Sequence, residues 1–306
     1  MQLKYLLAIG LLHLTPKACA QQDTSKTSIP YYSPGGTYSD WFFPKEDIES
    51  LEWTFVPVAD PSPSLKKEGL LHYYAYNFGV ENATSARGNG YAGLQTNGIF
   101  KNKQKGKVIN FSIWGSNGGK TSGWLNDENQ ESSGFQIMYP FPWIVQHQYA
   151  FELKQGPSGI DSLGKWWGLW VTDLNTHKTI FVGEQRVAKE IEGKSSIHLK
   201  PHSSMFGEDL HWWKSNNGNV KYSDCKSFQS SACAAVNISA NNGKIQPIKF
   251  TNFTNSGKIV NYENGFKTIN CQVSIYNDST NFNVQHNLGN WSPDAPNYLQ
   301  SIKSLK

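Results

Sequence analysis

The sequence predicts an all-β protein, an antiparallel β-sandwich of the jelly-roll or concanavalin-like type. Residues 71–184 form short runs of aromatic and β-branched residues that Gly, Asn and Pro interrupt. Within these runs the apolar residues alternate with period two, as in half-buried strands. Helical periodicity of any length is missing from the segment, and a parallel α/β fold would need helices between its strands. These three observations favour antiparallel sheets.

Residues 1–20 have the pattern of a secretory signal peptide. Lys4 precedes the apolar run YLLAIGLLHL, and Ala18-Cys19-Ala20 supplies a small-residue cleavage site. The run is about half the length of a membrane span, and no later stretch approaches the roughly 20 apolar residues that a span needs. We expect a secreted, extracellular protein that begins near Gln21 and does not insert into a membrane. Lipid attachment at Cys19 is the alternative, which the preceding Pro-Lys-Ala disfavours.

Residues 21–65 are expected to form an extended N-terminal segment and the first strand. The first part, to about residue 45, is rich in Ser, Thr, Pro, Gly and Tyr and has no regular periodicity. The run KEDIESLEW predicts one helical turn, and WTFVPV predicts the first strand. A Pro/Ser-rich loop, VADPSPSLKKEG, then leads into the aromatic part of the chain.

Residues 66–205 are expected to form the core domain of the sandwich. In KVINFSIWG the alternation predicts a core face of Ile109, Phe111 and Ile113 and a solvent face of Asn110 and Ser112. In YAFELK the predicted core face is Tyr149, Phe151 and Leu153. The runs WWGLWV and TIFVG, joined by the polar TDLNTHK, predict a hairpin.

Residues 206–306 change in texture to Asn, Ser, Lys and Gly, with short strands such as IQPIKF and CQVSIY. This C-terminal β region either continues the sandwich or forms a small disulfide-stapled appendage. Helical spacing in the tail predicts a short terminal helix with Tyr298, Leu299, Ile302 and Leu305 on one face.

Three cysteines remain after removal of the signal peptide: Cys225, Cys233 and Cys271. In an oxidising compartment we expect one disulfide and one free thiol. A Cys225–Cys233 pair would close a short local loop and is slightly preferred, with Cys271 as the alternative partner. No close Cys/His cluster indicates a metal site.

Six sequons for N-glycosylation follow the signal peptide, and together they favour a secreted glycoprotein. They lie at Asn82, Asn110, Asn237, Asn252, Asn277 and Asn290.

The charge of the chain does not indicate a nucleic acid or an anionic membrane as partner. Without residues 1–20 it has 26 basic and 24 acidic residues, a net charge of +2, and no run of like charge. Aromatic residues make up 13% of the chain, with 11 Trp, against 17% charged residues. That composition suits a secreted protein that presents rings to a ligand, although a sandwich core also uses many aromatics.

The strand WWGLWVTD gives the most specific hypothesis for a ligand site. Alternation places Trp166, Gly168 and Trp170 on one face. The two tryptophans would stand roughly 13 Å apart with no side chain between them. Two such rings could stack on separated sugar rings of a glycan; the alternative is that both faces of the strand are buried.

Four further aromatic residues are candidates for ligand contact. Tyr74 and Tyr76 form a stripe with Phe78, opposite Tyr73, and only one of these two faces can lie outside the core. Trp124 and Trp143 lie in loop-like contexts, where exposed rings serve recognition.

The sequence does not identify catalytic residues. A pair of converging carboxylates would be needed for glycoside hydrolysis, but no candidate acid lies in a local signature. The candidates are Glu128, Glu131, Glu152, Asp161, Asp173 and Glu184. No G-x-S-x-G elbow is present. No cofactor is expected, apart from a Ca²⁺ ion that Asn126, Asp127 and Glu128 could help to hold.

The order of three phrases resembles the uncharacterised secreted family called domain of unknown function 3472. The phrases are GYAGLQ at Gly90–Gln95, FSIW at Phe111–Trp114, and the Y-P-x-x-W turn and Y-x-F strand within Tyr139–Phe151. The resemblance covers about residues 70–205. The family commonly has Asp after the F-S-x-W phrase, where this chain has Gly115. The resemblance implies a fold and a secreted habit and transfers no catalytic residue.

Three functions are therefore compatible with the sequence. The first is a carbohydrate-binding, lectin-like protein whose partner is a glycan or polysaccharide. The second is a polysaccharide-active hydrolase or lyase on the same architecture. The third is a non-enzymatic structural or interaction protein of the extracellular surface.

Overall fold

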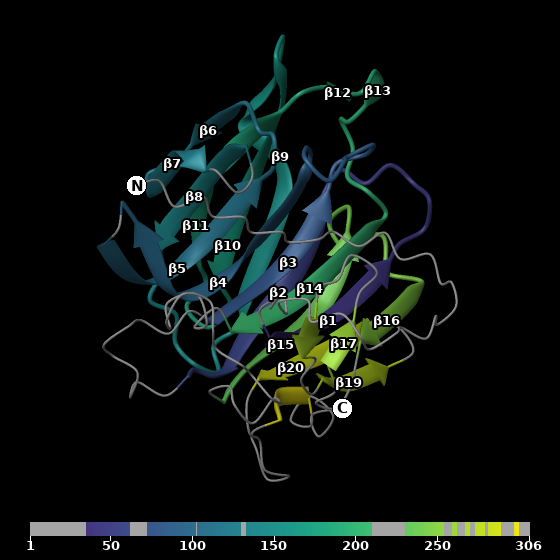
Figure 1. Ribbon diagram of the computed structural model, residues 1–306. Helices are drawn as coiled ribbons and strands as arrows, with labels where there is room; N and C mark the ends of the chain where they lie inside the picture. The colour runs from purple at the N-terminus through teal and green to yellow at the C-terminus, as the bar shows by residue number, and fades with distance from the viewer. Residues whose placement is uncertain are drawn as a thin grey trace, which may run out of the picture.

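Two eight-stranded antiparallel sheets pack face to face in the computed structural model (Figure 1). The structure describes residues 35–61, 72–101, 103–129, 133–209, 230–253, 259–261, 267–269, 273–278, 281–288 and 297–299. The predicted signal peptide lies outside these ranges. The prediction of an all-β, antiparallel architecture is confirmed.

The first sheet has the strand order β16-β1-β14-β3-β4-β5-β8-β7. Its strands are β1 (Gly35–Phe42), β3 (His72–Gly79), β4 (Asn89–Phe100), β5 (Lys103–Ile113), β7 (Trp124–Asn129), β8 (Gly134–Pro140), β14 (His202–Asp209) and β16 (Lys249–Phe253).

The second sheet has the order β19-β20-β15-β2-β9-β10-β11-β6. Its strands are β2 (Leu51–Ala59), β6 (Gly118–Lys120), β9 (Tyr149–Asp161), β10 (Gly164–Asp173), β11 (Lys178–Val187), β15 (Ser231–Ala240), β19 (Val273–Asp278) and β20 (Asn281–Leu288). Two small hairpins complete the described strands: β12 (Glu190–Ile191) with β13 (Lys194–Ser195), and β17 (Ile259–Asn261) with β18 (Lys267–Ile269).

The C-terminal β region is part of the sandwich. Strand β15 pairs with β2 and β20 inside the second sheet, and β16 pairs with β1 at the edge of the first. Figure 1 shows these strands in the lower half of the molecule. Of the two alternatives for residues 206–306, the structure therefore supports continuation of the sandwich.

The core lies between the sheets and is rich in stacked aromatic rings. Trp53 on β2 lies between Tyr76 on β3 and Phe151 on β9, with ring centroids 4.4 Å and 5.2 Å away and planes within 16° of parallel. The predicted inward faces of β5 and β9 are confirmed, because all six residues are buried in this core. The predicted hairpin is also confirmed, as β10 and β11.

Two local predictions at the N-terminal side are wrong. Residues 43–50 contain no helical turn; instead Ile48 is buried and its carbonyl accepts a hydrogen bond from the Leu199 amide, 2.8 Å away. Residues 35–42, expected to lack regular structure, form β1 between β14 and β16. In both places long-range pairing supplies the hydrogen bonds that the local sequence does not predict.

A second apolar cluster covers part of the outer face of the second sheet. Val56 and Val58 on β2 and Ala232 and Ala234 on β15 pack there against Leu299. Residues 298 and 299 are helical, which agrees with the start of the predicted terminal helix; Ile302 and Leu305 lie outside the described residues.

Cys233 carries a free thiol and is buried in the core. Burial raises the pKa of this thiol well above its usual value. The structure therefore does not confirm a disulfide at Cys233. Cys225 and Cys271 lie outside the described residues.

Within the residues that the structure describes, no helix has the length and apolar composition needed to cross a membrane.

His286 is a buried histidine between the sheets. Its Nδ1 lies 2.7 Å from the Thr37 hydroxyl and its Nε2 lies 2.8 Å from the Ser39 hydroxyl, both on β1. Burial lowers the pKa of this imidazole from 6.5 to about 3. The ring is therefore neutral in the folded protein at pH values where an unfolded chain would protonate it.

Acid should destabilise the fold through His286. Because the folded-state pKa is lowered, the stabilising contribution is complete above the unfolded pKa of 6.5 and is lost as the pH falls towards about 3. Between pH 7 and pH 5 this loss is about 2 kcal/mol. Urea unfolding at both pH values should show a loss that is larger by this amount in the wild type than in His286→Gln. Equal losses in the two proteins would contradict the prediction.

Candidate functional site

The outer face of the first sheet holds a patch of buried apolar side chains, most of them aromatic. Its members are Tyr73, Ala75, Tyr91, Trp114 and Phe206, with Tyr38 packed against them. The rings meet edge to face: the Tyr73 centroid lies 5.6 Å from that of Tyr91 and 5.3 Å from that of Phe206. On each strand the outward residues of the patch are next to inward core residues, as strand geometry requires: Tyr73 precedes Tyr74, and Tyr91 precedes Ala92. The patch is thus a further apolar cluster, separate from the core and from the cluster around Leu299.

Two long polar side chains flank Tyr73 in this patch. In the strand register Glu208 on β14 lies opposite Tyr73 on β3, and Tyr73 lies opposite Gln95 on β4. Directly opposed residues project from the same face of a sheet, so all three side chains point outward. The Cα atoms of Glu208 and Gln95 are two strand spacings apart, roughly 10 Å. A carboxyl and a carboxamide therefore stand on either side of one tyrosine ring.

Glu208 has the electrostatic properties of an acid–base group. Its side chain is only 5% exposed, and burial raises its pKa from 4.5 to about 7. The Tyr38 hydroxyl donates a 2.9 Å hydrogen bond to Oε1, which favours the carboxylate and opposes part of this rise. A carboxyl that titrates near neutral pH can both accept and donate a proton there. The phenol of Tyr73 stays neutral, since burial, followed by Tyr91 and Glu208, raises its pKa.

Gln95 is held in one orientation by Asn110 on β5. The Asn110 side-chain amide donates a 2.9 Å hydrogen bond to Gln95 Oε1, which leaves the Gln95 NH₂ group as a donor. That group makes one long hydrogen bond, 3.3 Å, to the Asn97 carbonyl. Asn110 Oδ1 is buried and accepts no hydrogen bond from any described residue. Such an acceptor is costly in a folded protein unless a water molecule or a ligand pairs with it.

This arrangement can perform proton transfer beside a polar group that binds oxygen. Glu208 can take a proton from water, and the Gln95 NH₂ can donate to an oxygen atom that gains negative charge. The buried Oδ1 of Asn110, which has no partner among the described residues, can accept from an N–H of a bound molecule. The aromatic rings around these groups keep the local dielectric low, which strengthens all three interactions.

The sequence-based hypothesis of an open gap between two tryptophans does not agree with the geometry. Trp166 and Trp170 do share the outer face of the second sheet, but Trp166 is buried and donates a 3.0 Å hydrogen bond to Asp161. Lys120 and Arg186 lie over its ring, 4.3 Å and 5.0 Å from the centroid.

Trp170 is half-buried and fills the space beside Gly168. Its ring comes within 2.6 Å of the point where a residue-168 Cβ would stand. Glycine is therefore needed to make room for the Trp170 ring, and the gap is closed by the protein itself. Sugar binding by Trp166 and Trp170 stays a prediction.

The stripe of Tyr74 and Tyr76 faces the core. Tyr74 Oη lies 2.6 Å from the Ser231 hydroxyl, and Tyr76 hydrogen-bonds Ser203. The opposite residue, Tyr73, is the one that faces outward. The structure therefore selects Tyr73, and not the stripe, for the outer surface of β3.

The two loop tryptophans differ in environment. Trp143 is buried, donates a 2.9 Å hydrogen bond to Asp60 and has Lys107 4.7 Å above its ring. Trp124 is half-buried on β7, with Lys105 4.7 Å from its ring centroid and Phe100 stacked at 6.3 Å. Trp124 on the edge strand therefore keeps some exposed ring surface.

The six sequons occupy different environments. Asn82 and Asn237 are exposed and Asn252 is half-buried. Asn110 is buried, against the expectation that it faces solvent, and its side-chain nitrogen, the atom that would carry a glycan, donates to Gln95. The Asn277 side chain and Asn290 lie outside the described residues.

The acids considered in the sequence do not form a carboxylate pair in the described part of the chain. Glu152 pairs with Lys154, Asp173 lies 3.2 Å from His147 and Glu184 lies 3.6 Å from Lys120. Hydrogen bonds from Trp166 and then Arg186 lower the pKa of the Asp161 carboxyl. In the segment on β7 considered for Ca²⁺, Asn126 is half-buried and Asp127 exposed, while the side chain of Glu128 lies outside the described residues. Glu131, another of the acids considered, also lies outside them.

Sequence reasoning missed Glu208 and Gln95 as a pair. Gln95 ends the phrase GYAGLQ, which carries the family resemblance, and Glu208 lies beyond the aromatic-rich residues 71–184. Alternation in SMFGED would have placed Phe206 and Glu208 on one face. Pairing of β14 with β3 places Glu208 beside Tyr73, and these residues are more than 100 positions apart in the chain. A local sequence pattern therefore cannot predict this contact.

Comparisons with known proteins gave only distant structural similarity. No family model and no curated protein matches the chain, so the resemblance to domain of unknown function 3472 stays a prediction. A solved structure of scytalido-glutamic peptidase with a transition-state analog inhibitor is 10% identical, with a TM-score of 0.41, and covers 82% of this chain and 97% of its own. SCP-B, a member of the Eqolisin family of peptidases, solved with the tripeptide Ala-Ile-His, is 9% identical, with a TM-score of 0.38 and the same coverage.

Alginate lyase vAL-1 from Chlorella virus is also similar at a lower level. It is 10% identical, with a TM-score of 0.23, and the match covers 57% of this chain and 82% of the lyase. At these scores none of the three structures assigns a family or an activity to the chain.

Proposed function

We propose that the chain is a hydrolase that cleaves amide bonds in extended polypeptides on the outer face of the first sheet. The observation that carries the proposal is the row Glu208–Tyr73–Gln95, in which a buried carboxyl with a pKa of about 7 stands across one ring from an oriented carboxamide. In this reaction Glu208 removes a proton from the attacking water and then protonates the departing amine. Gln95 stabilises the oxygen of the tetrahedral intermediate through its NH₂ group.

The polar groups beside Glu208 match a peptide group better than a sugar. A peptide unit offers one carbonyl acceptor and one N–H donor. Gln95 supplies a donor, and the buried Oδ1 of Asn110 supplies the complementary acceptor. Tyr73, Tyr91 and Phe206 surround these groups with apolar rings. The groups lie on neighbouring strands, β14, β3, β4 and β5, in a row that crosses the strand direction, as an extended peptide laid across the strands would require.

Glycoside hydrolysis by a carboxyl pair fits this face less well. Among the described outward-facing residues of β1, β14, β3, β4 and β5, Asp40 is the one other carboxylate. On β1 the residue opposite Glu208 is Gly36, and Asp40 lies four residues further along the strand. This spacing separates the two carboxylates by roughly 13 Å along the strand direction. Glycosidases place their two carboxyl groups about 5 to 9.5 Å apart. The lectin hypothesis stays a prediction with less support, because Trp166 is covered and the gap beside it is filled.

The experiment is a cleavage assay of the secreted protein on two substrate classes. Denatured protein and a uronate polysaccharide are each incubated at pH 4 to 8, and new termini are measured by mass spectrometry. We expect new peptide termini and no sugar cleavage, with peptide cleavage lost in Glu208→Gln and in Gln95→Ala. Cleavage of the polysaccharide would favour the alternative of a polysaccharide-active enzyme. Cleavage of neither substrate by a folded protein would overturn the proposal of a hydrolase.

The proposed site of action is outside the cell. The pattern of residues 1–20 and the exposed sequons at Asn82 and Asn237 support this. Comparison of cell lysate with culture medium after expression from the full sequence tests it: mature chain beginning near Gln21 is expected in the medium.

A further inference from the structure

Three segments from distant parts of the chain, around residues 48, 80 and 199, lie side by side just beyond the C-terminal end of β3. Ile48, Leu199 and Val80 pair across them and are all buried. Their backbones are joined by 2.8 Å hydrogen bonds from the Leu199 amide to the Ile48 carbonyl and from the Glu81 amide to the His198 carbonyl. Because neighbours of an inward residue point outward, the residues flanking this apolar row face the surface together.

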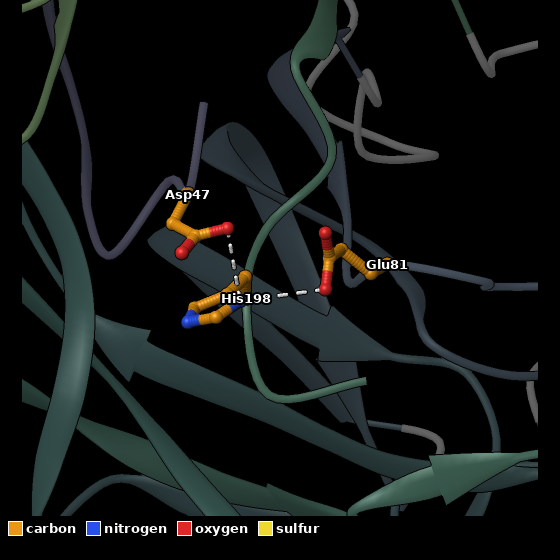
Figure 2. A group of neighbouring side chains, drawn as sticks. All are labelled: Asp47, Glu81 and His198. Carbon is orange, nitrogen blue, oxygen red and sulfur yellow. Dashed lines mark ion pairs between the residues drawn. The ribbon is translucent and has the colours of Figure 1, made fainter. Parts of the chain in front are cut away.

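Those outward residues bring one imidazole and two carboxylates together. His198 Nδ1 lies 3.5 Å from Asp47 Oδ1 and 3.4 Å from Glu81 Oε2, and all three atoms are within 4.8 Å of one another. Figure 2 shows the imidazole between the two carboxylates. Both distances exceed the 2.7–3.2 Å of a good hydrogen bond. They match the separation of about 3.3 Å between neighbouring ligand atoms of a tetrahedral ion bound at about 2.0 Å.

The other ring nitrogen of His198 is already engaged. Its Nε2 lies 2.9 Å from Glu49 Oε1, and the second oxygen of Glu49 is held at 2.8 Å by the ammonium group of buried Lys165. An Nε2–H that donates to Glu49 leaves the lone pair of a neutral imidazole on Nδ1. That lone pair faces two negatively charged oxygens, which is unfavourable unless a cation or a second proton lies between them. A carboxylate behind a histidine is also the usual support of a metal-binding imidazole.

We propose that Asp47, Glu81 and His198 bind a divalent transition-metal ion of the zinc type. One nitrogen and two carboxylate oxygens are a ligand set that Zn²⁺ accepts, with water in the fourth position. Glu49 acts behind His198 as a positioning residue. Asp47 is 76% exposed, so the ion can enter from solvent. The ion would join residue 47, residue 81 and residue 198, and so fix the three segments to one another.

This site does not depend on the proposed hydrolase activity. Glu81 lies eight residues beyond Tyr73 and past the end of β3, so the chain between them can span up to about 25 Å. No metal ligand belongs to the row of Glu208, Tyr73 and Gln95. Loss of metal binding and loss of peptide cleavage can therefore be measured independently. The competing arrangement is a doubly protonated His198 that forms ion pairs with both carboxylates and excludes the metal.

The test is a calorimetric titration of Zn²⁺ into the mature, chelator-treated protein at pH 7. We expect one equivalent to bind in the wild type and this equivalent to be lost in His198→Ala and in Glu81→Gln. Glu49→Gln should weaken binding by about 10- to 100-fold, since it removes the support of the ring and leaves the ligands. His202→Ala is the matched control, because that histidine faces one carboxylate, Asp40, at 3.3 Å; it should bind Zn²⁺ like the wild type.

A spectroscopic readout separates this site from other zinc-binding groups. Co²⁺ in place of Zn²⁺ should give the visible absorption of a four-coordinate ion in the wild type and in His202→Ala, and not in His198→Ala. Circular dichroism checks that each variant is folded, and Asp47→Asn, at an exposed position, gives a second variant of a ligand. The proposal is overturned if the folded wild type binds no Zn²⁺, or if His198→Ala and Asp47→Asn both bind it with wild-type affinity.

Discussion

Replacement of Glu208 by glutamine is expected to lower the rate of peptide hydrolysis by about two to four orders of magnitude, the usual contribution of a general acid–base group. Glutamine has nearly the same shape, and its carboxamide can still accept the hydrogen bond from the Tyr38 hydroxyl. It cannot exchange a proton with water or with the departing amine. The loss should therefore appear in kcat, measured as the initial rate of formation of new peptide termini at saturating substrate.

The same substitution should not destabilise the fold. The folded-state pKa of Glu208 is raised above its unfolded value, so the protonated form is favoured by folding. This contribution is complete below pH 4.5 and is lost as the pH rises through about 7. Above pH 7 the glutamine variant should thus be at least as stable as the wild type in urea unfolding. A variant that is both inactive and strongly destabilised would indicate a structural role for Glu208.

Glu184→Gln is the matched control for this prediction. Glu184 is also a buried glutamate, but it lies on β11 of the second sheet and accepts hydrogen bonds from Ser158. Its replacement should leave the rate of hydrolysis unchanged, even if stability falls. Equal losses of activity in the two variants would mean that Glu208 has no special part in the chemistry.

Much of the fold could be predicted because the strands obey the period-two alternation. The inward residues of β5 and β9 and the hairpin of β10 with β11 follow from local sequence. The elements that could not be predicted depend on distant partners. Strand β1 has no periodicity of its own and is specified by pairing with β14, about 170 residues away in the chain.

At the candidate site, alternation of apolar and polar residues predicts the direction of a side chain but not its environment. Alternation correctly places Asn110 on the face opposite the core, where a polar residue is expected to be exposed to solvent. In the structure that face is itself buried, and Asn110 holds Gln95. Period two distinguishes the two faces of a strand, but it does not say that the outer face carries a second apolar patch. The proposed metal ligands are still more difficult to predict from sequence. Asp47, Glu81 and His198 come from three segments that pair only through isolated β-bridges.

The largest stability effect is expected for Trp53→Ala. Trp53 is 1% exposed and its ring lies between Tyr76 of the facing sheet and Phe151 of the neighbouring strand, at 4.4 Å and 5.2 Å. Removal of a buried indole leaves a cavity that a rigid two-sheet core fills poorly, and such changes cost about 3 to 5 kcal/mol. Because the ring touches both sheets, the loss should appear in the single cooperative unfolding transition measured in urea.

The variant Trp53→Phe separates the effect of ring stacking on stability from the effect of the unpaired indole N–H. Trp53 Nε1 is buried and donates to no described residue, and an unpaired buried donor costs about 1 to 3 kcal/mol. Phenylalanine removes this donor and keeps a ring between Tyr76 and Phe151, so its loss of volume is partly offset. We expect the free energy of unfolding to fall by clearly less in Trp53→Phe than in Trp53→Ala. Equal losses would show that a ring kept between Tyr76 and Phe151 does not stabilise the contact between the sheets.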